Sequence, residues 1–175
     1  MKRTITLLTL MLSLTAVTGC TDKHNSATVE KTKDADKTRA EVREISEKFH
    51  TAYKAKQIET IKDMLMGNGS YSDTDHTEIF SYEPFIQHLN RKLLNPAIGT
   101  IQYKVDFQEI IFNTDMDEAT IIEQFNINIF TQYIPWRMVS HVVWKDNTWK
   151  YDIISFSLTP SNDVLPAINM AAKQE

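Results

Sequence analysis

The sequence has few of the residues that build a disulfide-rich or metal-rich module, since its 175 residues include a single cysteine, Cys20. One cysteine excludes an internal disulfide framework and a zinc module held by several cysteines. The formal net charge of −4 argues against nucleic acid as a partner, because binding to phosphates needs an excess of lysine and arginine. The G-x-S-x-G, H-E-x-x-H, G-x-G-x-x-G and P-loop patterns are also absent.

Hydrophobic residues, by contrast, make up 42% of the chain, which is too many for a disordered protein. The length fits one domain with appendages, because domains commonly span roughly 100–200 residues. Residues 20–37 contain almost no large apolar side chain, so they are predicted to form a flexible tether. The globular domain is predicted over residues 38–159, followed by a tail at 160–175 that can form a helix over 163–173.

The N-terminus has the features of an export signal. Residues 1–3 carry two positive charges, and residues 5–17 form an apolar segment of about 13 residues, too short to span a membrane as a helix. The segment ends in Val17-Thr18-Gly19-Cys20, which resembles a bacterial lipobox. The resemblance implies cleavage before Cys20, a diacylglycerol on its sulfur and an acyl chain such as palmitate on its amino group. An ordinary signal peptide with an incidental cysteine is the alternative.

The lipobox also predicts where the mature protein resides. Loss of Lys2 and Arg3 with the signal peptide changes the formal net charge from −4 to −6. Two or more acyl chains hold a protein stably on its membrane. In enteric-type bacteria an aspartate at the second mature position favours the inner membrane, but this residue is Thr21 here. We therefore expect a lipid-anchored protein of the cell envelope, on the periplasmic face of the outer membrane.

Three segments of the domain have helical periodicity. Over residues 38–53 apolar side chains recur at three- and four-residue steps, and charged side chains fill the other face. A second, short helical turn is predicted over residues 57–66. Ser81 can cap a third helix over residues 82–94, whose apolar side chains again form one face.

From Ile101 onward the periodicity changes to two, which predicts long antiparallel strands with one buried face. In the first strand the apolar positions are Ile101, Tyr103, Val105 and Phe107. Further strands are expected around residues 125–129, 136–145 and 148–158.

The register of these strands follows from two predicted turns. A two-residue turn at 146–147 places Trp144 opposite Trp149, and a turn at 134–135 places Phe125 opposite Trp144. This register separates an apolar face from a polar one, which a slip of one residue would destroy. The apolar face would contain Phe125, Ile127, Ile129, Tyr133, Trp136, Met138, Val142, Trp144, Trp149, Tyr151 and Ile153.

Helices followed by a long antiparallel sheet with one aromatic face indicate an α+β fold. Residues 49–61 resemble the first helix and following turn of the NTF2-like superfamily, especially its SnoaL-like branch. Residues 82–89 resemble its next helix, and residues 141–151 resemble its closing hairpin. The resemblance implies a cone in which N-terminal helices pack on a curved antiparallel sheet around a pocket. Some members are isomerases, cyclases or dehydratases, others bind ligands or partners, and many dimerise through the sheet.

His141 and Asp152 are the first pair of candidate catalytic residues. The register places them opposite each other, where they could act as a general base and its orienting carboxylate. Both belong to the polar face, so a solvated or dimer-facing pair is the simpler interpretation. Where catalytic relatives place a histidine late in the last strand, this chain has residues 153–155, Ile-Ile-Ser, which weakens the case for an enzyme.

Glu109 and Glu123 are the second candidate pair. If Phe107 pairs with Phe125, the two carboxylates face each other on the apolar side of the sheet. Close, desolvated carboxylates would raise one pKa, as an acid–base pair requires. The alternative is that both lie at the end of the sheet, in contact with water.

The segment that contains Asp73, Asp75, His76 and Glu78 has oxygen ligands at alternating positions, which could suit calcium. It lacks the correctly spaced glycine and closing glutamate of an EF-hand, so a surface loop is the favoured interpretation. We expect neither a metal nor a cofactor from the sequence.

Aromatic and hydroxyl side chains of the apolar face could line a ligand pocket. The candidate lining residues are Tyr103, Ser140, Trp144, Trp149 and Tyr151. The sequence therefore predicts a membrane-anchored lipoprotein whose NTF2-like domain binds a small apolar ligand or an envelope protein, and which could form a homodimer through its sheet. A small-molecule isomerase or hydrolase with pocket carboxylates is the alternative.

Overall fold

The structure, a computed structural model, describes residues 34–173. The predicted signal peptide, Cys20 and most of the predicted tether lie outside the described residues, so they remain predictions. Within 34–173, no helix combines the length and the apolar character that crossing a membrane requires.

The described residues form four helices, and the first begins three residues before residue 38. The helices are α1 (Ala35–Lys54), α2 (Ile58–Asp63), α3 (Tyr82–Leu93) and α4 (Leu165–Ala171). The Asp34 carboxylate caps α1 by accepting hydrogen bonds from the backbone N–H groups of Asp36 and Lys37. This cap extends the helix through residues 35–37, which corrects the predicted end of the tether at residue 37.

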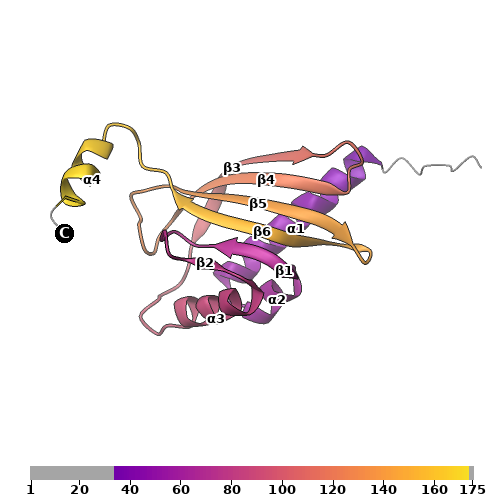
Figure 1. Cartoon of the computed structure of the whole chain (residues 1–175), viewed down its shortest axis with the longest axis horizontal. Helices are drawn as coiled ribbons and strands as arrows, with labels where there is room; N and C mark the ends of the chain where they lie inside the picture. The colour runs from indigo at the N-terminus through magenta and orange to yellow at the C-terminus, as the bar shows by residue number, and fades with distance from the viewer. Residues whose placement is uncertain (1–33, 174–175) are drawn as a thin grey trace, which may run out of the picture. The chain divides into compact units, whose positions relative to one another are not determined.

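Six strands form one mixed sheet (Figure 1). They are β1 (Leu65–Ser72), β2 (Ile79–Phe80), β3 (Tyr103–Phe112), β4 (Glu118–Ile127), β5 (Trp136–Lys145) and β6 (Thr148–Leu158). Their order is β2-β1-β6-β5-β4-β3, and every neighbouring pair is antiparallel except β1 and β6. The predicted α+β cone is confirmed, with β1 and β2 added to the four predicted strands.

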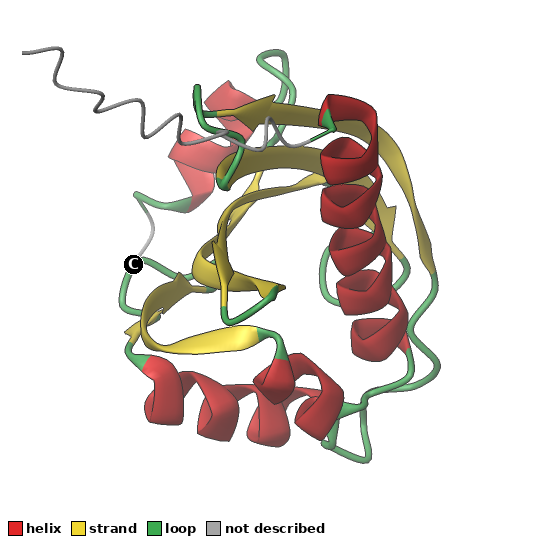
Figure 2. Cartoon of the chain, turned by 90° about the vertical axis from the view of Figure 1, so that its right-hand side faces the viewer, coloured by secondary structure: helices red, strands yellow, loops and turns green. Residues whose placement is uncertain are grey.

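The sheet curves strongly, with α1 along its concave side and α3 beside β1 (Figure 2). The core fills the space between these layers because α1, α3 and the concave face each present an apolar surface. Its largest fully buried side chains include Trp136, Tyr71, Tyr151, Phe49 and Phe85.

The parallel pair β1–β6 has an irregularity between Leu65 and Ser70. Gly69 lies in this irregular part, and a Cβ atom there would lie 2.7 Å from the carbonyl oxygen of Asp152. The close approach of the two backbones therefore requires glycine at this position.

The β5–β6 hairpin confirms the predicted turn at Asp146 and Asn147. Both residues have positive φ, 50° and 61°, as a two-residue turn of this type requires. Trp144 lies opposite Trp149, as predicted, with ring centroids 5.6 Å apart.

Farther along the hairpin, an irregularity at positions 141–142 changes the pairing by one residue. It gives Asp152 no direct partner, so Ser140 lies opposite Ile154. Ile154 is consequently fully buried and Ile153 is exposed, which corrects the prediction that Ile153 belongs to the apolar face.

The predicted turn at 134–135 is wrong, because residues 128–135 form a longer connection between β4 and β5. Phe125 lies opposite Trp136 rather than Trp144. The observed partner of Phe125 lies eight residues before the predicted one. Because side chains alternate between the two faces of a strand, a shift by an even number leaves each side chain on its predicted face. Tyr133, which falls in the connection, is exposed instead of packed on the apolar face.

Candidate functional site

A buried carboxylate lies on the concave face of the sheet, where its neighbours along β4 are apolar. This residue is Glu123, which is 0% exposed. It accepts hydrogen bonds from Ser46 Oγ at 2.5 Å, from Gln108 Nε2 at 2.8 Å and from His50 Nε2 at 3.0 Å. Three donors thus replace the water that the carboxylate loses on burial.

The three donors come from two elements. Ser46 and His50 are four residues apart on α1, so they lie on the same face of the helix, directed at the sheet. Gln108 comes from β3, where an irregularity between Val105 and Phe107 turns its side chain to the concave face.

His50 links Glu123 to a tyrosine. Its Nδ1 atom lies 2.8 Å from the hydroxyl oxygen of Tyr103. An ionised carboxylate can only accept, so Nε2 carries the proton that the histidine shares with Glu123. In the neutral imidazole, Nδ1 then accepts a hydrogen bond from the Tyr103 hydroxyl. The arrangement is a chain of hydrogen bonds, Tyr103–His50–Glu123.

Burial alone would raise the pKa of Glu123, but its partners outweigh that effect. The hydrogen bond and positive charge of His50, with the hydrogen bonds from Ser46 and Gln108, hold the pKa of this carboxyl below its usual value. Burial, assisted by Tyr53 and Glu123, raises the pKa of the Tyr103 phenol well above its usual range. At neutral pH the chain therefore combines an ionised carboxylate with a neutral phenol.

The hydrogen-bonded chain borders a cavity of about 440 Å³ between α1 and β3. The cavity is lined by Ser46, Glu47, His50, Thr51, Lys54, Tyr103, Lys104, Val105, Gln108 and Glu123. Exposed side chains of both charges, Glu47, Lys54 and Lys104, stand at its rim. Polar and apolar groups share the wall, so the cavity suits a small organic molecule with one polar group.

Two hydroxyl groups are buried in the adjoining core without a hydrogen-bond partner. They are Ser140 Oγ and Tyr151 OH. Burial, followed by the nearby charge of Glu123, raises the pKa of Tyr151 well above its usual value. Both residues were predicted to line a pocket, and both lie in the core beside the site rather than in the wall of the cavity.

The predicted pairing of Glu109 with Glu123 is wrong. The irregularity in β3 places Phe107 opposite Gln124, and therefore Glu109 opposite Ile122. Glu109 is exposed on the convex face, and Phe107 is 52% exposed there as well. The polar partners of Glu123 are Ser46, His50 and Gln108 instead.

Sequence reasoning missed Ser46 and His50, although the helix contained a signal for them. Both lie on the apolar face of α1. Ser46 directly follows the buried Ile45, and His50 directly follows the buried Phe49. A serine and a histidine four residues apart on a buried helical face need polar partners.

His141 and Asp152 do form a hydrogen bond, with Nδ1 and Oδ1 2.7 Å apart. Their side chains are half-buried on the convex face of the sheet, away from the cavity of His50. Glu118 approaches His141 Nε2 at 4.0 Å. Exposed apolar side chains of the same face include Phe107, Ile111, Val139 and Ile153. The homodimer through the sheet stays a prediction.

The five predicted pocket residues do not share one cavity. Tyr103 lines the cavity of His50, whereas Trp144 and Trp149 line a second cavity of about 410 Å³ between α1 and the β5–β6 hairpin. The second cavity contains Glu41, Glu44, Asp63, Lys48 and Lys150 as charged lining residues.

Comparisons with known proteins identify the fold. No protein-family model and no curated protein matches the sequence. Among solved structures, the chain is similar to an NTF2-like protein from Cytophaga hutchinsonii, with 14% identity, a TM-score of 0.58, and coverage of 69% of this chain and 98% of that one. An NTF2-like protein of unknown function from Pseudomonas putida gives 11% identity, a TM-score of 0.64, and coverage of 74% and 92%.

A third similar structure is a candidate dehydratase of the NTF2-like family from Streptomyces avermitilis, with 12% identity and a TM-score of 0.62. The match covers 72% of this chain and 99% of that one. The domain therefore has the NTF2-like fold. A shared fold at such low identity does not decide the activity.

Proposed function

We propose that this chain is a lipid-anchored envelope protein whose NTF2-like domain binds a small, largely apolar ligand with one polar group. The observation that carries the proposal is the chain Tyr103–His50–Glu123 in the wall of a 440 Å³ cavity. The resemblance of residues 17–20 to a lipobox supports the anchor. The proposed location is the periplasmic face of the outer membrane.

The chemistry of the wall indicates which polar group the ligand would carry. Glu123 already accepts three hydrogen bonds, so it orients its neighbours rather than binding a ligand directly. With a neutral imidazole, the Tyr103 proton is used for His50 Nδ1, and the phenol oxygen can accept from a ligand hydroxyl. With an imidazolium, Nδ1 donates to the Tyr103 oxygen, and the phenol proton is free for a ligand carbonyl. A hydroxyl compound therefore fits the first state of the Tyr103 hydroxyl, and a carbonyl compound fits the second.

A screen of small cyclic ketones and phenols against the purified protein, read by thermal unfolding, tests the proposal. A ligand at 100 times its Kd should add about 2.7 kcal/mol to the free energy of unfolding. Tyr103→Phe should weaken the best ligand about three- to tenfold, the usual value of one hydrogen bond. The variant keeps the ring that stacks on Phe125, with centroids 4.7 Å apart, so it should fold normally.

Tyr133→Phe is the matched control, since Tyr133 is 88% exposed and lies outside the cavity wall. Equal affinity of the wild type, Tyr103→Phe and Tyr133→Phe would contradict binding in this cavity.

A second candidate function is proton transfer in an isomerase or hydrolase. The 3.0 Å contact between His50 and Glu123 favours it, because a carboxylate that fixes an imidazole is the usual partner of a general base. Ketones from the screen should then exchange their α-hydrogens in D2O, as followed by NMR. A rate equal to that of buffer, or unchanged by His50→Gln, would leave ligand binding as the function.

A further inference from the structure

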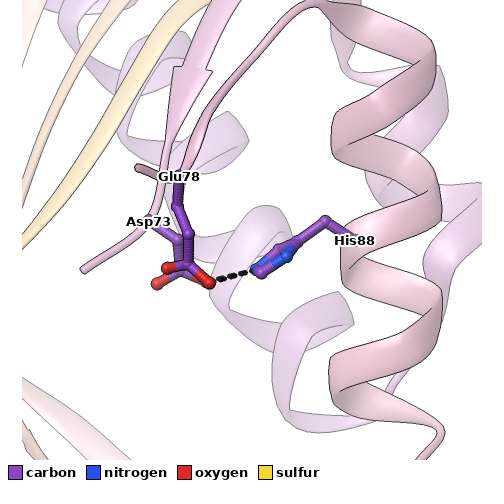
Figure 3. A group of neighbouring side chains, drawn as sticks. All are labelled: Asp73, Glu78 and His88. Carbon is purple, nitrogen blue, oxygen red and sulfur yellow. Dashed lines mark hydrogen bonds and ion pairs between the residues drawn. The ribbon is translucent and has the colours of Figure 1, made fainter. Parts of the chain in front are cut away.

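A second group of polar side chains lies apart from the Glu123 cluster, at the end of β1 (Figure 3). Asp73 directly follows β1, Glu78 precedes β2, and His88 comes from α3. One ligand atom from each lies within 4.8 Å of the other two. The group is mostly shielded from solvent, since the side chains of Asp73, His88 and Glu78 are 2%, 12% and 28% exposed.

The separations of these atoms resemble the edges of a metal coordination shell. His88 Nε2 lies 2.8 Å from Asp73 Oδ2 and 3.8 Å from Glu78 Oε1. Metal–ligand bonds of about 2.0–2.2 Å place neighbouring ligand atoms about 3–3.5 Å apart. The 2.8 Å contact is a hydrogen bond, so an ion bound here would replace the proton that His88 Nε2 shares with Asp73, which is released to solvent. It would also displace the Lys92 ammonium from Asp73 Oδ2. Small side-chain movements would then bring all three atoms around the ion.

Backbone groups already orient both carboxylates. Asp73 Oδ1 accepts a hydrogen bond from the N–H of Thr74 at 2.8 Å, and Glu78 Oε2 accepts one from the N–H of Asp75 at 3.1 Å. The second oxygen of each carboxylate is thereby left toward His88 (Figure 3). In metal sites, hydrogen bonds of this kind orient the ligating side chains toward the ion.

The imidazole is also held in place. The ring of Phe80 packs against the ring of His88, with centroids 4.7 Å apart and a 30° angle between their planes. The ring plane is therefore fixed with Nε2 toward Asp73 and Glu78.

A lysine now occupies part of the group. The ammonium of Lys92, one helical turn after His88 on α3, contacts Asp73 Oδ2. The same ammonium lies 4.7 Å from the Phe130 ring centroid and 5.3 Å from that of Trp136. Two carboxylates against one ammonium leave an excess negative charge at the group. The aromatic rings contact the ammonium in its present position, so they help to hold it beside Asp73.

We propose that Asp73, Glu78 and His88 form a zinc site, with the ammonium of Lys92 as a built-in competitor for it. One imidazole and two carboxylates are a donor set that zinc accepts. Three protein ligands leave a fourth position open for water or another small ligand. The site is separate from the cavity proposed for ligand binding, whose wall contains none of these residues.

Isothermal titration of the purified full chain with zinc chloride tests this site. Cys20→Ser is present in every sample, so that the thiol cannot contribute. The chain should bind one zinc ion, and His88→Gln should weaken binding by at least about tenfold, as loss of a metal-site contact does. Lys92→Gln should strengthen binding about tenfold, because it removes a positive charge beside the ion.

His76→Gln is the matched control. His76 lies two residues before Glu78, but its side chain is 91% exposed and it is not part of the group. This variant should bind zinc as the wild type does. Glu78→Gln changes a side chain that is 28% exposed, and it replaces His88→Gln if the latter fails to unfold cooperatively in the absence of zinc.

The absence of zinc binding in both the wild type and Lys92→Gln would overturn the proposal. So would binding that His88→Gln and Glu78→Gln leave unchanged, or binding that His76→Gln weakens as much. None of these outcomes would bear on the ligand cavity, because Tyr103→Phe tests that site separately.

Discussion

Replacement of His50 by leucine should lower the free energy of unfolding by about 3–5 kcal/mol, the usual cost of leaving one partner of a buried ion pair alone. Glu123 is fully buried, and His50 supplies both a hydrogen bond and positive charge to it. Leucine fills a similar volume but donates no hydrogen bond. Urea unfolding at pH 7, followed by tryptophan fluorescence, measures the loss.

A second substitution separates the buried charge from lost packing. Adding Glu123→Gln to His50→Leu removes the isolated charge and should recover part of the loss. His141→Leu is the control, because His141 and Asp152 form an even shorter contact, 2.7 Å, but a partly exposed one. It should cost at most about 1 kcal/mol. Equal losses at His50 and His141 would contradict the role assigned to burial.

Cys20→Ser should abolish the incorporation of radiolabelled palmitate and move the protein from the membrane fraction to the soluble fraction. The expected effect is complete, because Cys20 is the only cysteine and the proposed site of both attachment and cleavage. Metabolic labelling, followed by membrane fractionation and immunoblotting, measures both results.

Thr21→Asp provides the complementary test of the anchor. It keeps Cys20 and should keep the label, but it should move the protein from the outer to the inner membrane in an enteric-type host. Equal labelling of the wild type and Cys20→Ser would instead favour the ordinary signal peptide.

The helices and the β5–β6 hairpin could be predicted because their signals are local. The three-and-four spacing over residues 38–53 lies within one helix, and the turn at 146–147 lies within one hairpin. The faces of β4 and β5 were predicted despite a wrong connection, because an error of eight residues preserves the alternation. The periodicity of the sequence thus predicted which face of the sheet a side chain occupies more reliably than which residue lies opposite it.

Single-residue irregularities could not be predicted in the same way. One extra residue in β3 places Gln108 on the concave face of the sheet and Glu109 on the convex face. One extra residue in β6 places Ile154, rather than Ile153, in the core. No residue type marks either irregularity in the sequence. Beyond each one, the alternation of inward and outward side chains is reversed relative to the prediction. The strand β1 also lacks apolar alternation, because residues 65–72 contain two glycines and several polar residues.

The candidate site was predicted in part. Glu123 was singled out as a carboxylate of the apolar face, and it is one, but two of its three partners come from a helix about 75 residues earlier in the chain. In the sequence, Asp73 and Glu78 form a candidate cluster only with their neighbours, Asp75 and His76. His88, which contacts Asp73 from α3, could be found only once the fold brought the two segments together.

The parallel pairing of β1 with β6 makes the order of synthesis matter for this domain. Ser72 and Ser155, whose hydroxyl groups are 3.0 Å apart, are separated by 83 residues in the sequence. The stacked rings of Tyr71 and Phe85 can associate early because they are close in the chain. The strand that joins them to the rest of the sheet is the last one made. Until it arrives, β1 and β5 both have an unpaired edge, which is a state that favours association between chains.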